Sequence, residues 1–369
     1  MRTPIERFYP LIPAGGVGSR LWPLSRAHAP KFLLDLTGSG ESLIRQTYDR
    51  LLGISNGSVM VVTGESHANA VTQQITELRG SDLVLEPSPK DSAAAIGLAC
   101  AILYLRDSEA IIGSFAADHV IDPVSEFHKV VREAVETAAT GKIVTIGITP
   151  TSPSTAFGYI KAHRLLDIDG APSALAVDSF VEKPDAETAA TYVDSGEYTW
   201  NAGMFVAPAQ LMLTHLEQNE PELYAGIMKI AHAWDTSERE DVMQATWPTL
   251  PKNAIDYAVA EPAAAAGDVA MVPGSFSWDD VGDFDAVTRL IQIKSNEELT
   301  VLGNSDTVIT QDTTGIVVSE GKRLISVIGM SDVVVVDTDD ALLVTTRKDA
   351  QKVKDTVAEL KNRSLTELL

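Results

Sequence analysis

Between Phe8 and Ile148, short apolar runs alternate with segments in which apolar residues recur at helical spacing. No other feature restricts the fold as much, because strands separated by helices pair in parallel and the helices cover both faces of the sheet. The predicted strands are 8–14, 58–64, 82–87, 110–118 and 142–148, and the predicted helices are 43–52, 67–78, 93–105 and 127–139. We therefore expect a Rossmann-like α/β fold with a mixed, mainly parallel sheet.

The pattern changes after Pro150, where strands mix with turns and helical stretches up to about residue 293. From Val301 onward the chain is a series of short β-rich runs, and an amphipathic pattern over 350–361 predicts a closing helix. We expect two domains, 1–295 and 296–369, the second being small and β-rich, with a short β-helix as one form it can take. The many valines and isoleucines of this tail favour packing or self-association.

Charge and composition exclude several classes of function. The formal net charge of −22 opposes binding to nucleic acid and to anionic membranes. No apolar run approaches the roughly 18 residues of a membrane span, and no signal peptide opens the chain, so we expect a cytoplasmic protein. The single cysteine, Cys100, excludes an intramolecular disulfide and lies in an alanine-rich apolar run that favours burial.

The first predicted strand leads into a glycine-rich loop, "IPAGGVGSRLWPLSRAHAPKF". The glycines of 15–18 let backbone N–H groups approach a ligand, and Arg20 and Lys31 indicate that this ligand is an anion such as phosphate. A Walker A loop would need glycine followed by lysine and serine or threonine, which is absent here. A dinucleotide fingerprint would need a third glycine where Leu21 stands.

The stretch "AGGVGSRLWPLSRAHAPKFLL" resembles the signature loop of the sugar-nucleotide pyrophosphorylases, a family of nucleotidyltransferases. Further motifs of that family follow in order: "EPSPKDSAAAIGLA", "FAADHVI", "FGYI", "FVEKP", "WNAGMF", "FSWDDVGDFDA" and "VVVVDTDDALLV". Two positions depart from the pattern, since "DSAAAI" replaces "NTAPAI" and Phe32 replaces a glutamine. The resemblance covers about residues 8–360 and implies a GT-A-like nucleotidyltransferase fold, with residues 1–295 as the catalytic domain.

The motifs are most similar to those of the mannose guanylyl branch, which implies transfer of GMP from GTP to mannose 1-phosphate, giving GDP-mannose and pyrophosphate. The sugar phosphate is already an anion, so positioning and charge neutralisation are sufficient for catalysis. One alternative is UTP or dTTP with glucose 1-phosphate. Another is a non-catalytic, ligand-sensing subunit, which we would expect to have lost the arginine, the lysine or the metal-binding aspartates. Relatives with this fold commonly form dimers, so we also expect a homodimer.

The resemblance places the nucleotide on the glycine-rich loop. The planar guanidinium of Arg20 suits the β- and γ-phosphates, and the compact ammonium of Lys31 suits the α-phosphate. Guanine presents N–H donors, so Glu86 is the expected acceptor for the base, with Asp91 as a second candidate. The predicted nucleotide-binding residues are Ala14, Gly15, Gly16, Gly18, Ser19, Arg20, Lys31, Glu86 and Asp91.

Asp118 ends an apolar strand, where a carboxylate is costly to bury unless it is paired or bound to a metal. The family motif supplies a second carboxylate, Asp280, which we choose over Asp279 and Asp283 because it directly precedes Val281-Gly282. Two aspartates that converge on phosphate oxygens favour Mg²⁺ with several waters retained. The predicted catalytic residues are Arg20, Lys31, Asp118 and Asp280, and the last two are the predicted metal ligands.

The resemblance assigns the sugar phosphate to three later motifs. In "FVEKP", Glu182 would accept hydrogen bonds from mannose hydroxyls and Lys183 would hold the phosphate. Asn201 in "WNAG" can both donate to and accept from a hydroxyl. Gly158 in "FGYI" would let the backbone come close to the sugar ring.

Overall fold

The computed structural model describes residues 3–295 and 298–369 of the chain. These residues form two compact units. The first unit consists of Met1–Gly15, Thr47–Ala117 and Ile121–Trp278, and the second of Gly16–Gln46, Asp118–Val120 and Asp279–Leu369. The second unit thus combines the C-terminal segment with the loop that follows the first strand. The domain boundary that we place between residues 295 and 296 stays a prediction, because residues 296 and 297 lie outside the described residues.

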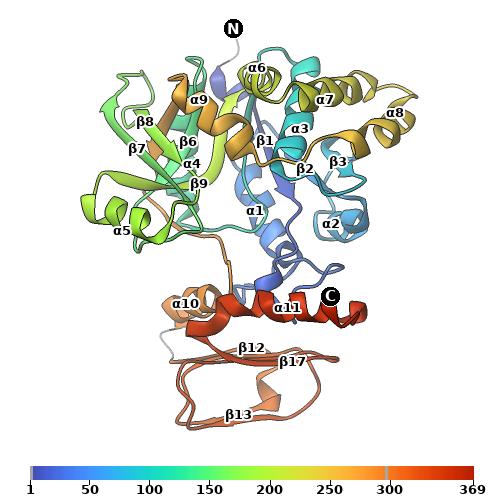
Figure 1. The fold of residues 1–369 in the computed structure, drawn as a ribbon, viewed down its shortest axis with the longest axis vertical. Helices are drawn as coiled ribbons and strands as arrows, with labels where there is room; N and C mark the ends of the chain where they lie inside the picture. The colour runs from blue at the N-terminus through green and yellow to red at the C-terminus, as the bar shows by residue number, and fades with distance from the viewer. Residues whose placement is uncertain (1–2, 296–297) are drawn as a thin grey trace. The chain divides into compact units, whose positions relative to one another are not determined.

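The first unit is built on a nine-stranded sheet (Figure 1). Its strands are β1 (Phe8–Ala14), β2 (Met60–Gly64), β3 (Leu83–Glu86), β4 (Ile111–Ser114), β6 (Ile143–Ile148), β7 (Gly158–Leu165), β8 (Leu175–Val181), β9 (Tyr198–Pro208) and β10 (Val269–Pro273). They lie in the order β3-β2-β1-β4-β9-β6-β10-β8-β7. Only β8 and β9 run against the other strands, so the expected mixed, mainly parallel sheet is confirmed.

Helices cover the sheet as βαβ alternation requires. They are α1 (Leu43–Leu52), α2 (Ala68–Gln74), α3 (Ser92–Arg106), α4 (Val124–Ala138), α5 (Ala186–Ser195), α6 (Ala209–Asn219), α7 (Pro221–Ala233), α8 (Arg239–Thr246) and α9 (Glu261–Ala265). Helix α3 is buried without interruption from Ala93 to Leu103, because it packs between the sheet and helices α6 and α7 in one apolar core. Figure 1 shows α6, α7 and α8 gathered beside α3.

Two of the predicted elements are longer than the elements that the structure shows. The helix expected over 67–78 is only α2, because Ile75 leaves the helical conformation (φ −117°, ψ 77°) and is completely buried. The strand expected over 110–118 ends at Ser114. Two further strands, β5 (Val120–Asp122) and β11 (Ser277–Asp279), have three residues each. No helix among the described residues combines the length and apolar character needed to cross a membrane.

The C-terminal segment of the second unit is β-rich, as expected, and of the forms open to it the structure shows a short parallel β-helix. Its strands are β12 (Leu299–Gly303), β13 (Val308–Gln311), β14 (Gly315–Ser319), β15 (Ile325–Ile328), β16 (Val333–Asp337) and β17 (Leu342–Thr346). Strands β12, β14 and β16 pair in parallel, β17 joins them antiparallel to β16, and β13 pairs with β15 in a second sheet. Helix α10 (Phe284–Ser295) precedes this segment and α11 (Val353–Asn362) follows it, which confirms the predicted closing helix (Figure 1).

Along the β-helix strands, successive side chains point to opposite faces of the sheet and therefore pack into two different cores. Val317, Val333 and Val335 pack inside the β-helix with side chains of β15. On the opposite face of the four-stranded sheet, the core contains Ile316, Val318, Val334 and Val336 together with Leu21, Leu36, Leu43, Val281, Phe284 and Val287. The loop that carries the signature motif is therefore buried on its apolar side by the C-terminal strands.

Candidate active site

The signature loop leaves open space along its first glycines. A Cβ atom added at Gly15 or Gly16 would meet no heavy atom within 4 Å, so a ligand can approach the backbone there. Gly18 is constrained instead. Its φ is +79°, and an added Cβ would lie 2.9 Å from the Cβ and Cγ atoms of Lys31. Glycine is thus required at residue 18 both by the backbone conformation and by the packing of Lys31 against it.

The loop is held on both sides of Arg20. The Ser25 hydroxyl donates to the carbonyl oxygen of Gly18 at 2.5 Å, and the indole N–H of Trp22 donates to the carbonyl oxygen of Leu368 at 2.7 Å. Leu21 is completely buried. Arg20 itself is half-buried, and no ion pair joins it to any residue that the structure describes. Its guanidinium is therefore available to an anionic ligand while its neighbours are fixed.

Lys31 brings two of the predicted catalytic residues together in the second unit. Its ammonium lies 2.8 Å from Oδ2 of Asp118 and donates to the carbonyl oxygen of Asp280 at 2.8 Å. The side chains of Lys31 and Asp118 are only 13% and 19% exposed, so this ion pair is largely shielded from solvent. The ammonium thus ties the signature loop to both segments that carry the predicted metal ligands.

The two aspartates differ in how well their charge is compensated. Burial works against the charge of Asp118, but Lys31 and His119 outweigh it and hold the pKa of Asp118 below its usual value. For Asp280, burial and the charges of Asp279, Asp118 and Asp283 together outweigh Lys31 and raise its pKa. The protein therefore stabilises the ionised form of Asp280 less well than that of Asp118.

This donor set fits a hard cation. Asp118 and Asp280 supply two carboxylates, and Mg²⁺ commonly takes one or two protein carboxylates and completes its shell with water and phosphate oxygens. No cluster of three or more histidine, cysteine, aspartate or glutamate side chains suited to a metal occurs in the described part of the chain. The residues present therefore suit a cation shared with a phosphate ligand better than a closed structural metal site.

In the first unit, Glu86 ends β3 with its side chain buried and its Oε1 atom without a hydrogen-bond partner. Burial, together with the charge of Asp91, raises the pKa of Glu86 to about 7. Asp91 lies at the N-terminus of α3 with φ +72°, and its carboxylate accepts a hydrogen bond from the N–H of Ser92 at 2.9 Å. Glu86 is thus an unsatisfied acceptor, whereas Asp91 is partly occupied by its own helix.

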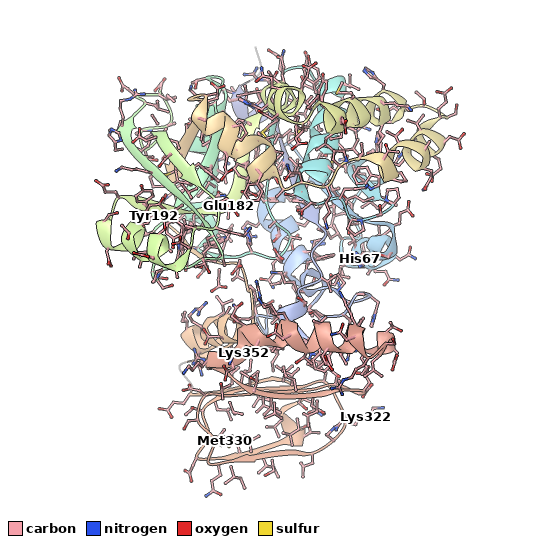
Figure 2. All side chains as sticks on the ribbon, viewed as in Figure 1. His67, Glu182, Tyr192, Lys322, Met330 and Lys352 are labelled. Atoms are coloured by element: carbon pink, nitrogen blue, oxygen red, sulfur yellow. The ribbon has the colours of Figure 1, made fainter. Side chains whose placement is uncertain are left out.

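The four predicted sugar-phosphate residues meet at the ends of β7, β8 and β9. Gly158 pairs with Asn201 in the register of β7 and β9, and Glu182 follows β8 directly (Figure 2). A Cβ atom at Gly158 would lie 2.4 Å from Oε2 of Glu182. The structure therefore shows a reason for glycine that differs from the predicted one: the space beside Gly158 is taken by the Glu182 carboxylate.

Glu182 and Lys183 form a close pair with unequal exposure. The Lys183 ammonium lies 2.8 Å from Oε1 of Glu182, and the two side chains are 54% and 6% exposed. Oε2 of Glu182 is buried and has no hydrogen-bond partner. Burial opposes the charge of Lys183, but Glu182 and Asp256 outweigh it and raise the pKa of Lys183. Lys183 also adopts the left-handed conformation (φ +46°), which is uncommon for residues other than glycine.

The expectation that Asn201 can still accept a hydrogen bond needs correction. Its Oδ1 atom already accepts from the Thr145 hydroxyl at 2.8 Å and from the N–H of Gly203 at 3.0 Å. Its amide nitrogen donates to Oδ1 of Asp256 at 3.1 Å. Asn201 therefore keeps one free N–H and acts as a donor only.

Asp256 is a member of this cluster that our sequence analysis missed. It begins a π-helical turn, Asp256–Ala260, an irregularity that is frequent at functional sites. Burial and the charge of Glu182 raise the pKa of Asp256 to about 6. The signal was present in the sequence: an aspartate inside the apolar run "NAIDYAVAEPAAAA" is as costly to bury as Asp118 is at the end of its strand.

Two family models match the chain. The model described as "Nucleotidyl transferase" matches residues 9–297, and the model described as "MannoseP isomerase/GMP-like beta-helix domain" matches residues 306–360. Together they include every residue that we assign to the candidate site and most of the β-helix.

Relatives and solved structures agree with these matches. The chain is 37% identical over 365 residues to a mannose-1-phosphate guanylyltransferase of Salmonella typhimurium, covering 98% of this chain and 74% of the relative. It is 36% identical over 361 residues to a mannose-1-phosphate guanylyltransferase of Escherichia coli K12, covering 96% and 74%. A Thermus thermophilus structure titled "mannose-1-phosphate geranyltransferase" superimposes with a TM-score of 0.83 at 28% identity, covering 96% and 99% of the two chains.

Proposed function

Because this chain belongs to the nucleotidyl transferase family, among the mannose-1-phosphate guanylyltransferases, we propose that it transfers GMP from GTP to mannose 1-phosphate. The products are GDP-mannose and pyrophosphate. The observation that carries this proposal is the convergence of Lys31, Asp118 and Asp280, beside a glycine loop with open backbone, in a chain so similar to these enzymes.

The reaction needs charge neutralisation more than proton transfer. An oxygen of the sugar phosphate attacks the α-phosphorus of GTP, the bond to the bridging oxygen breaks, and pyrophosphate leaves. Arg20 binds the departing phosphates, for which its planar set of N–H donors is suited. Lys31 binds the α-phosphate as negative charge accumulates there, so Asp118 must exchange part of its contact with Lys31 for another cation.

Mg²⁺ is the cation that we propose, held by Asp118 and Asp280. When bound, it would supply Lewis-acid polarisation of the phosphate oxygens and a template for their orientation. The raised pKa of Asp280 supports this assignment, because burial and the neighbouring aspartates oppose its ionised form and a bound cation would stabilise that form.

We assign Glu182 and Asp256 as the acceptors of hydrogen bonds from the mannose hydroxyls. Lys183 is assigned to binding of the phosphate group. The buried, unpartnered Oε2 of Glu182 would gain its missing hydrogen bond from a mannose hydroxyl, which favours substrate over water in this site. Asn201 would donate its remaining N–H. Gly158 leaves room for the carboxylate of Glu182.

The direct test of this proposal is pyrophosphate release measured with four nucleoside triphosphates against mannose 1-phosphate and glucose 1-phosphate. We expect GTP with mannose 1-phosphate to give the highest kcat/KM. A preference for UTP or dTTP with glucose 1-phosphate would instead assign the chain to another sugar nucleotide. No pyrophosphate release with any pair would favour a ligand-sensing role.

Two substitutions should separate sugar-phosphate binding from nucleotide binding by kinetics. Losing a hydrogen bond to a charged group costs about 1.5–3 kcal/mol, or roughly tenfold to a hundredfold in binding. We therefore expect Lys183→Ala to raise KM for mannose 1-phosphate by this factor with little change in KM for GTP. Arg20→Ala should lower kcat/KM for GTP. Equal effects of both variants on both substrates would contradict the assignment.

Recognition of guanine should depend on pH through Glu86. Its pKa of about 7 means that the carboxylate accepts hydrogen bonds from guanine above this pH and becomes protonated below it. We therefore expect the ratio of kcat/KM for GTP to that for ATP to fall as the pH decreases from 8 to 6. The Glu86→Gln variant should show a lower ratio that no longer changes over this range.

The raised pKa of Glu86 also predicts how the stability of the protein depends on pH. A folded-state pKa raised from 4.5 to about 7 makes the folded state less stable above pH 7 by about 3 kcal/mol. Glu86→Gln should therefore raise Tm at pH 8 and leave it unchanged at pH 4. A lower Tm for the variant at pH 8 would show that the carboxylate is satisfied in the free protein.

We also propose a homodimer. Leu342 and Val344 are 49% and 59% exposed on β17, which is an edge strand of the four-stranded sheet. An exposed apolar edge favours pairing with another chain.

A further inference from the structure

The segment that carries Asp280 has a strained backbone. Val281 adopts the left-handed conformation with φ +48°, which is rare for a β-branched residue, and its side chain is completely buried. The carboxylate of Asp280 lies close to Gly282, since an added Cβ at Gly282 would be 3.4 Å from both of its oxygens. The direction of the Asp280 side chain therefore depends on what holds the Val281 conformation in place.

Two neighbouring carboxylates bind the backbone at Val281 and at the start of α10, which follows it. Oδ1 of Asp279 accepts the N–H of Val281 at 2.8 Å. On the other side, Oδ1 of Asp283 accepts the N–H of Ala286 at 3.0 Å and so fixes the start of α10. Neither carboxylate is thus available as a simple substitute for Asp280, although all three lie within five residues.

Each of these carboxylates is itself held by a side chain from outside the segment. Nη2 of Arg289 lies 2.7 Å from Oδ2 of Asp279, and the side-chain amide of Gln351 donates to Oδ2 of Asp283. Arg289 belongs to α10. Gln351 belongs to the turn that follows β17, the last strand of the β-helix.

Arg347, in the same turn as Gln351, is connected to Arg289 through a carboxylate that both arginines bind. Nη1 of Arg289 lies 3.0 Å from Oδ2 of Asp285, and Oδ1 of Asp285 lies 2.7 Å from Nε of Arg347. Arg289 therefore binds the carboxylates of Asp279 and Asp285. The Asp285 carboxylate also binds Arg347, which lies in the turn that follows the β-helix. All of these groups belong to the second unit.

We propose that Arg289 and Gln351 are positioning residues for Asp280. They hold Asp279 and Asp283, which in turn fix the strained Val281 turn and the direction of the Asp280 carboxylate. The β-helix end would then contribute to activity without touching substrate. This inference rests on the proposed function insofar as Asp280 is a metal ligand, and loss of such a supporting contact typically lowers metal affinity or activity about 10–100-fold.

The experiment compares Arg289→Met and Gln351→Leu with the wild-type full-length chain. Arg363→Met is the matched control, because Arg363 forms an ion pair of the same length, 2.7 Å with Glu359, and contacts neither Asp279 nor Asp283. Three quantities are measured: Mn²⁺ affinity by electron paramagnetic resonance, kcat and KM for both substrates, and hydrogen exchange of the peptide 278–288.

We expect the two test variants to weaken Mn²⁺ binding and lower kcat about 10–100-fold, with KM for mannose 1-phosphate unchanged and exchange of 278–288 accelerated. Arg289→Lys should recover part of the loss, since lysine can contact one of the two carboxylates. The control should match the wild type. The inference is overturned if the test variants keep wild-type Mn²⁺ affinity and exchange, or if Tm falls while kcat of the folded fraction stays unchanged.

The outcome also distinguishes this inference from the proposed function. If the wild type releases no pyrophosphate from any substrate pair, the proposed function fails. Mn²⁺ affinity and hydrogen exchange would then still report whether Arg289 and Gln351 hold the segment.

Discussion

Replacing Asp280 with asparagine should lower kcat by at least two orders of magnitude while the fold stays intact. Asparagine keeps the shape of the side chain but removes the charge that a divalent cation requires from its ligand. Because burial, together with the charges of Asp279, Asp118 and Asp283, raises the pKa of Asp280, the Asp280→Asn variant no longer has this unfavourable buried charge in the free protein. We therefore expect Tm in the absence of metal to stay equal or to rise.

The measurement is kcat at saturating Mg²⁺ together with thermal unfolding in excess chelator. Asp283→Asn serves as the comparison, because Asp283 caps α10 and accepts from Gln351. That variant should lose stability and lose less activity per folded molecule. If Asp283→Asn lost most of its activity and Asp280→Asn kept most of it, the wrong carboxylate would have been assigned. Wild-type activity that persists in excess chelator would remove the metal from the mechanism.

Removal of the β-helix should be the most damaging change to the protein as a whole. A chain that ends at Ser295 would lose the strands that cover Leu21, Leu36 and Leu43. Each buried aliphatic side chain contributes about 1.5–3 kcal/mol, so these three together contribute about 4.5–9 kcal/mol, which is comparable with the whole stability of a typical domain. We expect the shortened chain to aggregate and to show no activity. A soluble, fully active truncated chain would show that this core is dispensable.

A matched pair of substitutions measures the same effect without truncation. Ile316 is completely buried in the core shared with the signature loop, whereas Ile309 is 53% exposed on β13. Ile316→Ala should lower the free energy of unfolding by about 2–5 kcal/mol, and Ile309→Ala by less than about 0.5 kcal/mol. Equal losses would contradict the burial that we describe.

Local sequence patterns determined much of the fold. The alternation of apolar runs and helical periodicity reflects which side of each element must be buried, so it predicted the parallel strands and the helices between them. The helix over Leu43–Leu52 matches α1 without change. The strand and helix ends that we placed wrongly, at Ile75 and Ser114, are places where tertiary packing ends an element before its local pattern does.

The motifs likewise indicated the residues of the site, but not how each is used. Asp118 and Lys31 came from the sequence, and their ion pair came from the structure. Gly158 was expected to admit the sugar, yet the structure shows the Glu182 carboxylate in that space. Asp256 was missed because we considered the cost of burying a carboxylate only for Asp118, at the end of a strand. We did not consider it for an aspartate inside a helical segment.

The sequence by itself determined the family, the order of strands and helices along the chain, and the charged residues of the candidate site except Asp256. Only the tertiary structure decided that the signature loop and the β-helix share one core, and that Arg289 and Gln351 support the turn at Asp280. The physical reason is distance along the chain. Periodicity and turn chemistry act over a few residues, whereas Leu21 and Val334 are brought together by burial of apolar surface between segments that no local pattern relates.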